Sequence, residues 1–461
     1  MPDALSPCTA NLNRSPAAAR RPGRLPVTIA ILAITAAHVV GRVGSFCAPT
    51  HADSFLYAAI GYRMAHGEPL YGPTLSDVKP PGIYAFYALS YALLPPGRSS
   101  IIPVDTLFAA LGYWTVYRLG RIVYGSAVSV IVTATFAIVV NAFMVLDFAT
   151  EAFGLAESFM IFPAALAASV YFAAVARPLY RNCVAIGCAL GACLAVKQTA
   201  VALVGAIALH LTFTAIVDRW PFRRCVATLA GVGVGALFAT LPFLVLVMAQ
   251  GTWRSAIAAI GPQALRLLSA ESAWPTDWGE IQPLWVPLGW CAIGLFAWRE
   301  HSSRAPRPDR ARPVSPRTAL DTPCDDSPRH GRSAIRAIHV GFLLTWLAAE
   351  VALLAFLPLR SAHYYIPLCI PLLILSGMFW KGLSAVPLII RGPAFAVAAV
   401  VSIAFLRPVF NRIIPIAVSR YRAYEPTADR AHFDALVRQP FLVLGPTMSR
   451  SAPTEWPAKP Q

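Results

Sequence analysis

Long apolar runs alternate with short polar connections along most of the chain. A membrane-spanning helix needs roughly 20 apolar residues, and fewer where the protein thins the bilayer or shields the helix ends. Eleven segments fit this pattern, so we predict an all-α polytopic membrane protein. The predicted spans are 25–46, 100–117, 124–145, 157–175, 183–197, 200–217, 226–249, 283–298, 336–357, 364–380 and 392–406.

The arginines between these runs set the orientation of the spans. Cytoplasmic loops carry an excess of Lys and Arg, so we place the N-terminal tail, residues 1–24, in the cytoplasm. The same rule predicts three later cytoplasmic turns, marked by Arg118 and Arg121, by Arg177 and Arg181, and by Arg219, Arg223 and Arg224. Residues 183–217 must then cross the bilayer twice, with Lys197-Gln198-Thr199 as the polar break between two short spans.

Composition agrees with a membrane protein and narrows its partners. The chain is 57% hydrophobic and 13% charged, whereas soluble domains carry about 25% charged residues. Its nine cysteines show neither a CxxC pair nor a Cys/His metal pattern, so we expect no disulfide framework and no zinc site. The net charge of +16 gathers in short loops and tails beside apolar runs. The orientation rule explains this charge, and we expect no nucleic-acid partner.

Two segments lie outside the alternation of spans and turns. Residues 299–336 are rich in Arg, Pro, Ser and Asp, and this composition predicts a disordered cytoplasmic loop within the membrane domain, residues 25–406. Residues 407–461 form a short C-terminal tail, which eleven spans would leave on the outer face. The arginines of this tail contradict the charge rule on that face.

The first polar segment after the first span, residues 47–99, is crowded for a simple connector. It holds several ionisable groups and a series of tyrosines between Tyr57 and Tyr91. The Lys79-Pro80-Pro81 step is stiff, because proline fixes its own φ and restricts the residue before it. A rigid turn therefore presents Asp77 and Lys79 in one place, and we interpret this loop as the floor of an active site.

Each candidate in this loop also has a structural explanation. Asp53 lies one helical turn before Tyr57, and its carboxylate could act as a general base or orient an acceptor hydroxyl. It could equally cap a helix. Asp77 and Lys79 could form a surface ion pair that contributes little to stability. Alternatively, Lys79 could neutralise a phosphate, and its place beside two prolines at the bilayer surface favours this role.

Further ionisable residues lie at the edges of later spans. Asp147 and Glu151 are four positions apart on one helix face, where like charges repel. Glu157 opens the fourth span, and an ionisable group at the edge of the hydrocarbon is a functional candidate. Lys197 interrupts an apolar segment and must snorkel, pair or face a polar cavity. Solvated loop carboxylates and a snorkelling lysine are the structural alternatives.

Aromatic residues mark the predicted outer surface. The 250–282 loop carries Trp253, and interfacial tryptophans usually belong to an aromatic belt, with sugar stacking the alternative. His363 and Tyr364 precede the tenth span, where a belt role and a ligand contact are equally consistent with the sequence. We expect His38, near the outer end of the first span, to snorkel.

The first loop resembles that of the lipid-linked-sugar-dependent glycosyltransferases of the GT-C fold. It is most similar to family 39, which includes the protein O-mannosyltransferases and the aminoarabinose transferases of lipid A. Those loops read Asp-Glu-x-x-Tyr, then Gly-x-x-x-Tyr, then Asp-x-Lys-Pro-Pro-x-x-Tyr. The matching pieces here are Asp53-Ser54-Phe55-Leu56-Tyr57, Gly67-Glu68-Pro69-Leu70-Tyr71 and Asp77-Val78-Lys79-Pro80-Pro81-Gly82-Ile83-Tyr84. Later similar segments are Gly120–Gly125, Ala156–Met160, Gly187–Ala200 and His363–Pro367, so the resemblance covers about residues 25–380.

The resemblance implies a GT-C membrane enzyme that moves one sugar, with inversion, from a polyprenyl-phosphate donor to an extracytoplasmic lipid, glycan or protein acceptor. Asp53 would be the base or orienting carboxylate, and Lys79 with Lys197 would stabilise the leaving phosphate. The substrate-binding residues would be Tyr57, Asp77, Tyr84, Asp147, Glu157, His363 and Tyr364. The implied location is the bacterial inner membrane, among membrane lipids, with the site on the extracytoplasmic side.

One position departs from the family pattern. The acidic residue that usually follows the first Asp is Ser54 here, so the resemblance does not carry a second carboxylate or a metal role to this step. No cofactor is specified, and a divalent metal requirement stays open.

Two other functions are compatible with an apolar chain. A transporter or lipid flippase would place charges near the bilayer midplane and divide into pseudo-symmetric halves, and the sequence shows neither feature. An inactive relative whose first loop merely binds lipid is the other alternative, suggested by Ser54.

Overall fold

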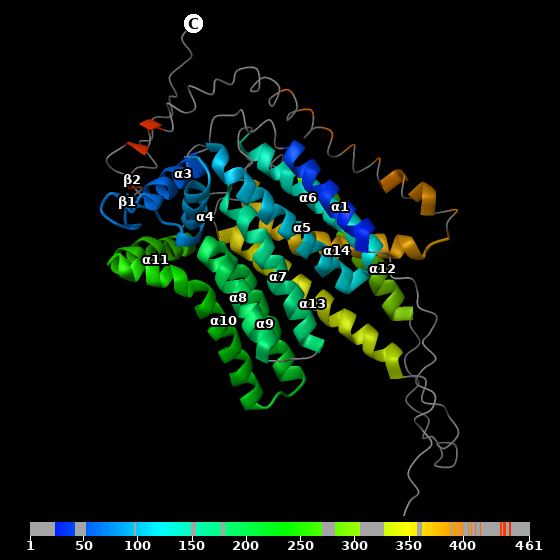
Figure 1. Cartoon of the computed structure of the whole chain (residues 1–461). Coiled ribbons are helices and arrows are strands. Elements are labelled where there is room, and N and C mark those ends of the chain that lie inside the picture. Colours follow the sequence, from blue (N-terminus) through cyan, green and yellow to red (C-terminus); the bar gives the residue numbers. More distant parts are fainter. Residues whose placement is uncertain are drawn as a thin grey trace, which may run out of the picture.

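The computed structural model describes residues 24–41, 52–95, 98–148, 154–176, 180–269, 282–304, 327–356 and 362–387, and isolated positions between 389 and 443. The described part is a bundle of long helices with a smaller group of helices packed at one end (Figure 1). The predicted all-α membrane fold is confirmed. The number of spans stays a prediction.

The long helices run alternately up and down the bundle (Figure 1). Six described segments are long and apolar enough to cross a membrane: Ser126–Phe143, Ala156–Ala174, Gln198–Val217, Phe222–Ala249, Ala337–Ala355 and Ile366–Ser384. The long helices are α1 (Arg24–Gly41), α5 (Ile102–Tyr124), α6 (Ser126–Phe148), α7 (Ala156–Ala176), α8 (Tyr180–Val196), α9 (Val201–Val217), α10 (Phe222–Ala249), α12 (Gln282–Arg304), α13 (Ser327–Phe356) and α14 (Ile366–Ala385).

The smaller group contains the first loop and a helix from the middle of the chain (Figure 1). The short helices predicted in the first loop are α3 (Ala52–Ala65) and α4 (Pro81–Leu93). The helix α11 (Trp253–Ser269) follows α10. Strand β1 (Leu75–Ser76) pairs in parallel with β2 (Leu442–Val443), so part of the C-terminal tail lies against the first loop.

Several predicted boundaries move. The second predicted span ended at residue 117, whereas helix α5 continues to Tyr124. Arginine is a good helix former, so Arg118 and Arg121 extend the helix, which ends at Gly125 with φ 91°. Helices α12 and α13 also reach into the predicted disordered loop at both ends, and residues 305–326 lie outside the described residues.

Residues 183–217 form two helices with a break at Lys197, as predicted, and their double crossing of the bilayer stays a prediction. Helix α8 ends at Val196, and α9 begins at Val201. Between them Lys197 is extended, with φ −153° and ψ 135°, and Gln198–Ala200 form a single 3-10 turn, η2. This break therefore directs polar side chains out of an otherwise apolar pair of helices.

Glycines allow α8 and α10 to pack in direct backbone contact. A Cβ atom at Gly235 would collide with the carbonyl oxygen of Val184, and one at Gly187 would collide with that of Val232. In the same way, Gly82 of α4 lies against the carbonyl of Ala195. These contacts hold α8 against α10 within the bundle and hold α4 against the end of α8.

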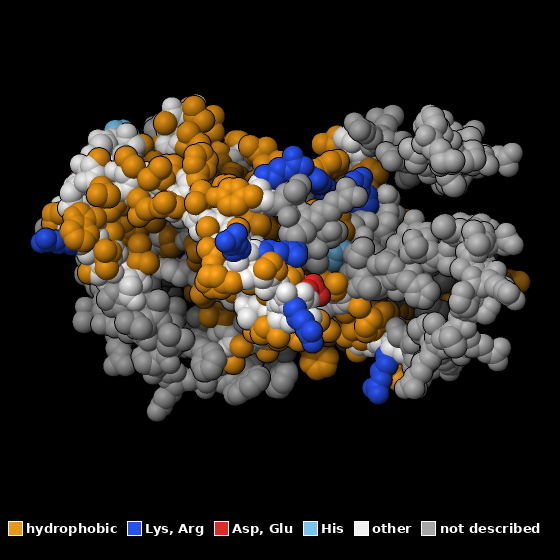
Figure 2. All heavy atoms as spheres, turned by 90° about the horizontal axis from the view of Figure 1, so that it is seen from below, with side chains coloured by type: hydrophobic (Ala, Val, Ile, Leu, Met, Phe, Trp, Pro, Cys, Tyr) orange, Lys and Arg blue, Asp and Glu red, His pale blue; other side chains and the backbone are white. Residues whose placement is uncertain are grey.

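Basic side chains gather at the opposite end of the bundle. Figure 2 views this end and shows Lys and Arg among hydrophobic side chains, with few acidic side chains among the described residues. Arginines lie near the helix ends there: Arg118 and Arg121 in α5, Arg181 in α8, and Arg219, Arg223 and Arg224 around the α9–α10 turn. This distribution is the one that the orientation rule predicts for a cytoplasmic face.

The expectation that His38 snorkels was wrong. Its side chain is 1% exposed, and its Nδ1 is hydrogen-bonded to the hydroxyl of Tyr113. The polar ring is therefore paired inside the bundle.

Candidate active site

The centre of the candidate site is an ion pair between Asp53 and Lys79. Asp53 lies in the first turn of α3, where the helix dipole favours a negative charge, and Lys79 precedes α4. The Nζ of Lys79 is 2.7 Å from Oδ2 of Asp53, and the two side chains are 16% and 29% exposed. The Tyr57 hydroxyl donates a hydrogen bond of 3.2 Å to the same carboxylate oxygen. The Lys79 ammonium also lies 4.6 Å from the centroid of the Tyr57 ring.

Asp77 does not pair with Lys79, so the surface ion pair considered from sequence does not form. Its side chain is buried, with 2% of the residue exposed, and it organises the turn from within. Oδ1 accepts a 2.6 Å hydrogen bond from the backbone N–H of Val78, and Oδ2 accepts one from the Tyr84 hydroxyl. Asp77 and Tyr84 thus shape the turn that carries Lys79.

Two further side chains hold this turn from outside. The hydroxyl of Tyr71 donates a 2.6 Å hydrogen bond to the carbonyl of Lys79, and Nε2 of Gln198 donates one of 2.6 Å to the carbonyl of Val78. Tyr71 has φ 62°, in the left-handed region, which costs on the order of 1–2 kcal/mol for an L-residue. This strained residue lies where its hydroxyl fixes the Lys79 backbone.

The tyrosines of the site are hydrogen-bond donors at neutral pH. Burial, and then the negative charge of Asp53, raises the pKa of Tyr57 well above its ordinary value. Burial, and then the charge of Asp77, raises the pKa of Tyr84 in the same way. Both hydroxyls therefore keep their protons and stabilise the carboxylates that they contact.

A second ion pair, between Lys197 and Glu157, lies deeper in the protein. Lys197 occupies the break between α8 and α9, and Glu157 lies in the first turn of α7. The two residues are 4% and 2% exposed, and Nζ of Lys197 contacts Oε1 of Glu157. The Lys197 ammonium is 4.1 Å from the centroid of the Tyr364 ring. Lys197 thus pairs inside the protein and does not snorkel.

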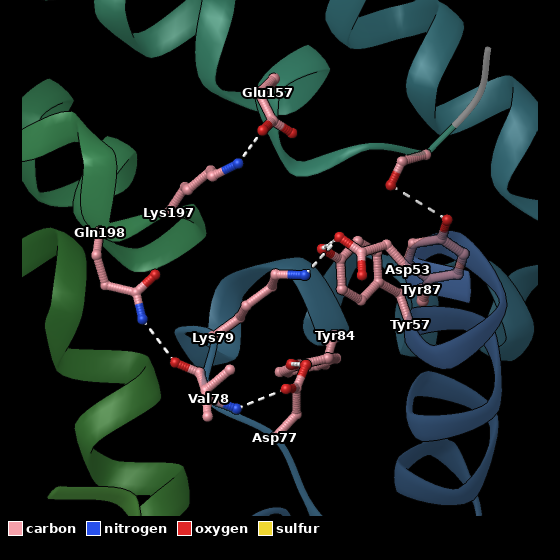
Figure 3. A network of polar contacts seen from close by, with 11 residues as sticks. Asp53, Tyr57, Asp77, Val78, Lys79, Tyr84, Tyr87, Glu157, Lys197 and Gln198 are labelled. Atoms are coloured by element: carbon pink, nitrogen blue, oxygen red, sulfur yellow. Dashed lines mark hydrogen bonds and ion pairs between the residues drawn. The ribbon is translucent and has the colours of Figure 1, made fainter. Parts of the chain in front are cut away.

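Figure 3 shows both ion pairs and the hydrogen bond that connects the segments bearing them. Lys79 and Lys197 come from different parts of the chain, and Val78 and Gln198, their immediate neighbours, are bonded to each other. The structure therefore brings most of the predicted site residues into one region: Asp53, Tyr57, Asp77, Lys79, Tyr84, Glu157, Lys197 and Tyr364. The side chains of Asp147 and His363 lie outside the described residues.

An apolar cavity of about 950 Å³ adjoins the Lys79 turn. Its walls come from the first loop and from α8, α10 and α11. The lining residues include Tyr71, Pro80, Pro81, Leu194, Ala195, Gln198, Phe243, Leu244, Val247, Trp253 and Ile257. A cavity of this size and polarity suits a hydrocarbon chain, with its polar end beside the turn.

Sequence reasoning missed two contributors to the site. Gln198 stood out as part of a polar break and of the family-like segment Gly187–Ala200, but its distance of 120 positions from Val78 gave no sign of their contact. Tyr71 was matched to a family motif, but nothing in the sequence indicated its bond to the Lys79 carbonyl. Within the described residues, no three His, Cys, Asp or Glu side chains are grouped to hold a metal ion.

The family resemblance is supported by a family model and by the fold. Residues 78–246 match the family described as dolichyl-phosphate-mannose-protein mannosyltransferase, a stretch that contains Lys79, Glu157 and Lys197. The sequence has no significant match among curated proteins.

Among the solved structures that share the fold are an oligosaccharyltransferase and ArnT. The apo oligosaccharyltransferase of Archaeoglobus fulgidus superposes with a TM-score of 0.55 at 12% identity, over 84% of this chain and 56% of that one. ArnT from Cupriavidus metallidurans bound to undecaprenyl phosphate superposes with a TM-score of 0.54 at 16% identity, over 90% of this chain and 76% of that one. The chain thus spans about half the length of the oligosaccharyltransferase. The predicted GT-C fold is confirmed.

Proposed function

We propose that this protein is a membrane glycosyltransferase that moves a sugar from a polyprenyl-phosphate donor to an acceptor hydroxyl. The observation that carries the proposal is the Asp53–Lys79 pair, a carboxylate and a cation beside an apolar cavity of about 950 Å³. The ArnT structure with the same fold holds undecaprenyl phosphate, which supports a donor of this chemical class.

The cavity binds the lipid part of the donor, and the two lysines bind its phosphate. The isoprenoid chain occupies the apolar cavity, which leaves the phosphate at the Lys79 turn. An ammonium group binds phosphate as a point charge. Lys197 lies on the segment bonded to that turn and supplies a second cation.

The reaction needs a base and a neutralised leaving group. The acceptor hydroxyl attacks the anomeric carbon, and its proton passes to the Asp53 carboxylate. The bond between that carbon and the phosphate oxygen breaks with inversion, and the electron pair stays on the phosphate. Lys79 and Lys197 stabilise the charge that develops there.

The ion pair also explains how the site is controlled by its donor. Lys79 is paired with the Asp53 carboxylate at 2.7 Å. A bound phosphate draws the ammonium toward itself and leaves Asp53 available to the acceptor. Binding of the first substrate thus prepares the base for the second.

The basic end of the bundle supports an orientation for the reaction. We take the arginine-rich end as the cytoplasmic one by the orientation rule, and we therefore propose that the site faces the extracytoplasmic side of a bacterial inner membrane. Lipid, glycan and protein acceptors can all present a hydroxyl there.

Reconstituted transfer tests this function against its two alternatives. The purified protein in liposomes is given polyprenyl phosphates carrying different radiolabelled sugars, together with cell-envelope lipids, glycans and proteins. Label in the acceptor fraction is the expected result. Movement of intact labelled lipid between leaflets without transfer would identify a flippase, and binding with neither transfer nor movement would identify an inactive relative.

A further inference from the structure

Gln198 makes the contact that joins the two lysine-bearing segments. It is the first residue of the 3-10 turn between α8 and α9, immediately after Lys197. Its Nε2 donates a 2.6 Å hydrogen bond to the carbonyl of Val78, immediately before Lys79. The same side chain lines the apolar cavity.

The local backbone explains why Lys197 and Gln198 point to different partners. Lys197 leaves the helix in an extended conformation, with φ −153° and ψ 135°, although its N–H still bonds to the carbonyl of Cys193. Successive side chains of an extended residue pair diverge. Lys197 therefore reaches Glu157 inside the bundle while Gln198 reaches the first loop (Figure 3).

The Lys79 turn depends on side chains for its polar contacts. Pro80 follows it and has no N–H to donate. Asp77 and Tyr71 bond to this turn from within the first loop. Gln198 bonds to it from the bundle, so among the described hydrogen bonds of the turn it is the one that fixes Lys79 relative to Lys197.

We propose that Gln198 is a positioning residue that fixes the Lys79 turn against the bundle, so that the Lys79 ammonium meets the donor phosphate beside the apolar cavity. This inference rests on the proposed function. Gln198 does not itself touch the reacting atoms. Its effect is transmitted through Val78 to Lys79, because a shift of the turn moves the cation by the same amount.

The test is a double-mutant cycle with Lys79. Gln198→Met keeps the volume and apolar contacts in the cavity but removes the donor to Val78. The matched control is Gln250→Met, because Oε1 of Gln250 accepts a 3.1 Å hydrogen bond from the N–H of Leu70 in the same loop, away from the turn. Donor KM and kcat are measured for each variant, and the rise in melting temperature on adding sugar-free polyprenyl phosphate is measured alongside.

Gln198→Met is expected to raise the donor KM about tenfold and to reduce the rise in melting temperature on adding polyprenyl phosphate by at least half. An effect of this size lies within the range of interaction energies between residues in contact. Gln250→Met is expected to change neither. In a Lys79→Met background, Gln198→Met should have no further effect, because the residue acts through Lys79.

Two outcomes overturn the inference. In the first, Gln198→Met matches the wild type in donor KM and thermal shift. In the second, Gln198→Met raises the donor KM by the same factor in the Lys79→Met background as in the wild type. That result is expected of a residue that stabilises the fold without acting through Lys79. Absence of transfer in the wild type would instead refute the proposed function, and the thermal shift would still show whether Gln198 supports phosphate binding through Lys79.

Discussion

The Nζ of Lys79 lies 2.7 Å from Oδ2 of Asp53, so the cation and the base candidate of this site neutralise each other. The two residues are 26 positions apart and come from the beginning of α3 and the turn before α4. Because both side chains are partly exposed, an incoming phosphate can compete for the ammonium. In the proposed reaction, the pair therefore couples donor binding to release of the carboxylate.

Replacing Lys79 with Met should weaken donor binding more than replacing it with Arg, which keeps the charge. A charged hydrogen bond contributes about 1.5–3 kcal/mol, so we expect a loss of about tenfold to a hundredfold for Lys79→Met. The donor KM in reconstituted liposomes measures the effect. Lys381→Met removes an exposed lysine at the other end of the bundle and should leave the donor KM unchanged. Equal donor KM values for Lys79→Met and the wild type would contradict the assignment.

Variants of the buried pair of Lys197 and Glu157 should affect protein stability and sugar transfer differently. Removing one partner leaves an uncompensated buried charge, which costs about 3–5 kcal/mol, so Glu157→Gln alone should lower the melting temperature strongly. Combining it with Lys197→Met removes both charges and should restore most of the stability without restoring transfer. A double variant that transfers sugar at the wild-type rate would exclude Lys197 from phosphate stabilisation.

The contact between α8 and α10 should tolerate no side chain at Gly235. A Cβ there meets the carbonyl of Val184, so Gly235→Ala must separate the helices at a cost of about 1–3 kcal/mol. Gly233→Ala lies on the same helix with open space around its Cβ and is the matched control. Melting temperatures in detergent compare the two. If both variants have the same melting temperature, the close packing of these helices is not required for stability.

Protein stability should fall as the pH rises above 10. Tyrosine in an unfolded chain has a pKa near 10, and burial followed by the charge of Asp77 raises the pKa of Tyr84 above this value. The folded state therefore holds its proton more tightly. Its stabilising contribution is complete below pH 10 and is lost as the pH rises beyond it. Tyr84→Phe removes the titrating group and should flatten the decline in melting temperature between pH 9 and 11. The exposed Tyr180→Phe is the control. A decline as steep in Tyr84→Phe as in the wild type would refute this origin.

The helices could be predicted from sequence because apolar runs and arginine clusters are properties of short, continuous stretches of the chain. Residues 183–217 are an example, since the positions of arginines alone required two crossings with a break at Lys197. The end of α5 was not predictable in this way, because Arg118 and Arg121 extend a helix as readily as they mark a turn.

The site was predicted as a set of residue types but not as a set of partners. Lys79 was expected beside Asp77, its near neighbour. In the fold, Lys79 instead forms an ion pair with Asp53, and Asp77 accepts a hydrogen bond from Tyr84. Glu157 and Lys197 were separate candidates, and only helix packing showed that they neutralise each other. Such pairings depend on tertiary contacts, which residue spacing does not encode.

The central claim, that Asp53 accepts the proton of the acceptor, is tested most directly by Asp53→Asn. The amide keeps the shape of the side chain but cannot act as a base, and loss of a general base lowers rates by about 10²–10⁴-fold. Asp218→Asn, an exposed residue at the other end of the bundle, provides the matched acid-to-amide control. With equal amounts of folded protein, we predict that Asp53→Asn loses at least a hundredfold in the rate of sugar transfer while Asp218→Asn retains the wild-type rate. Transfer by Asp53→Asn at the wild-type rate would contradict the account.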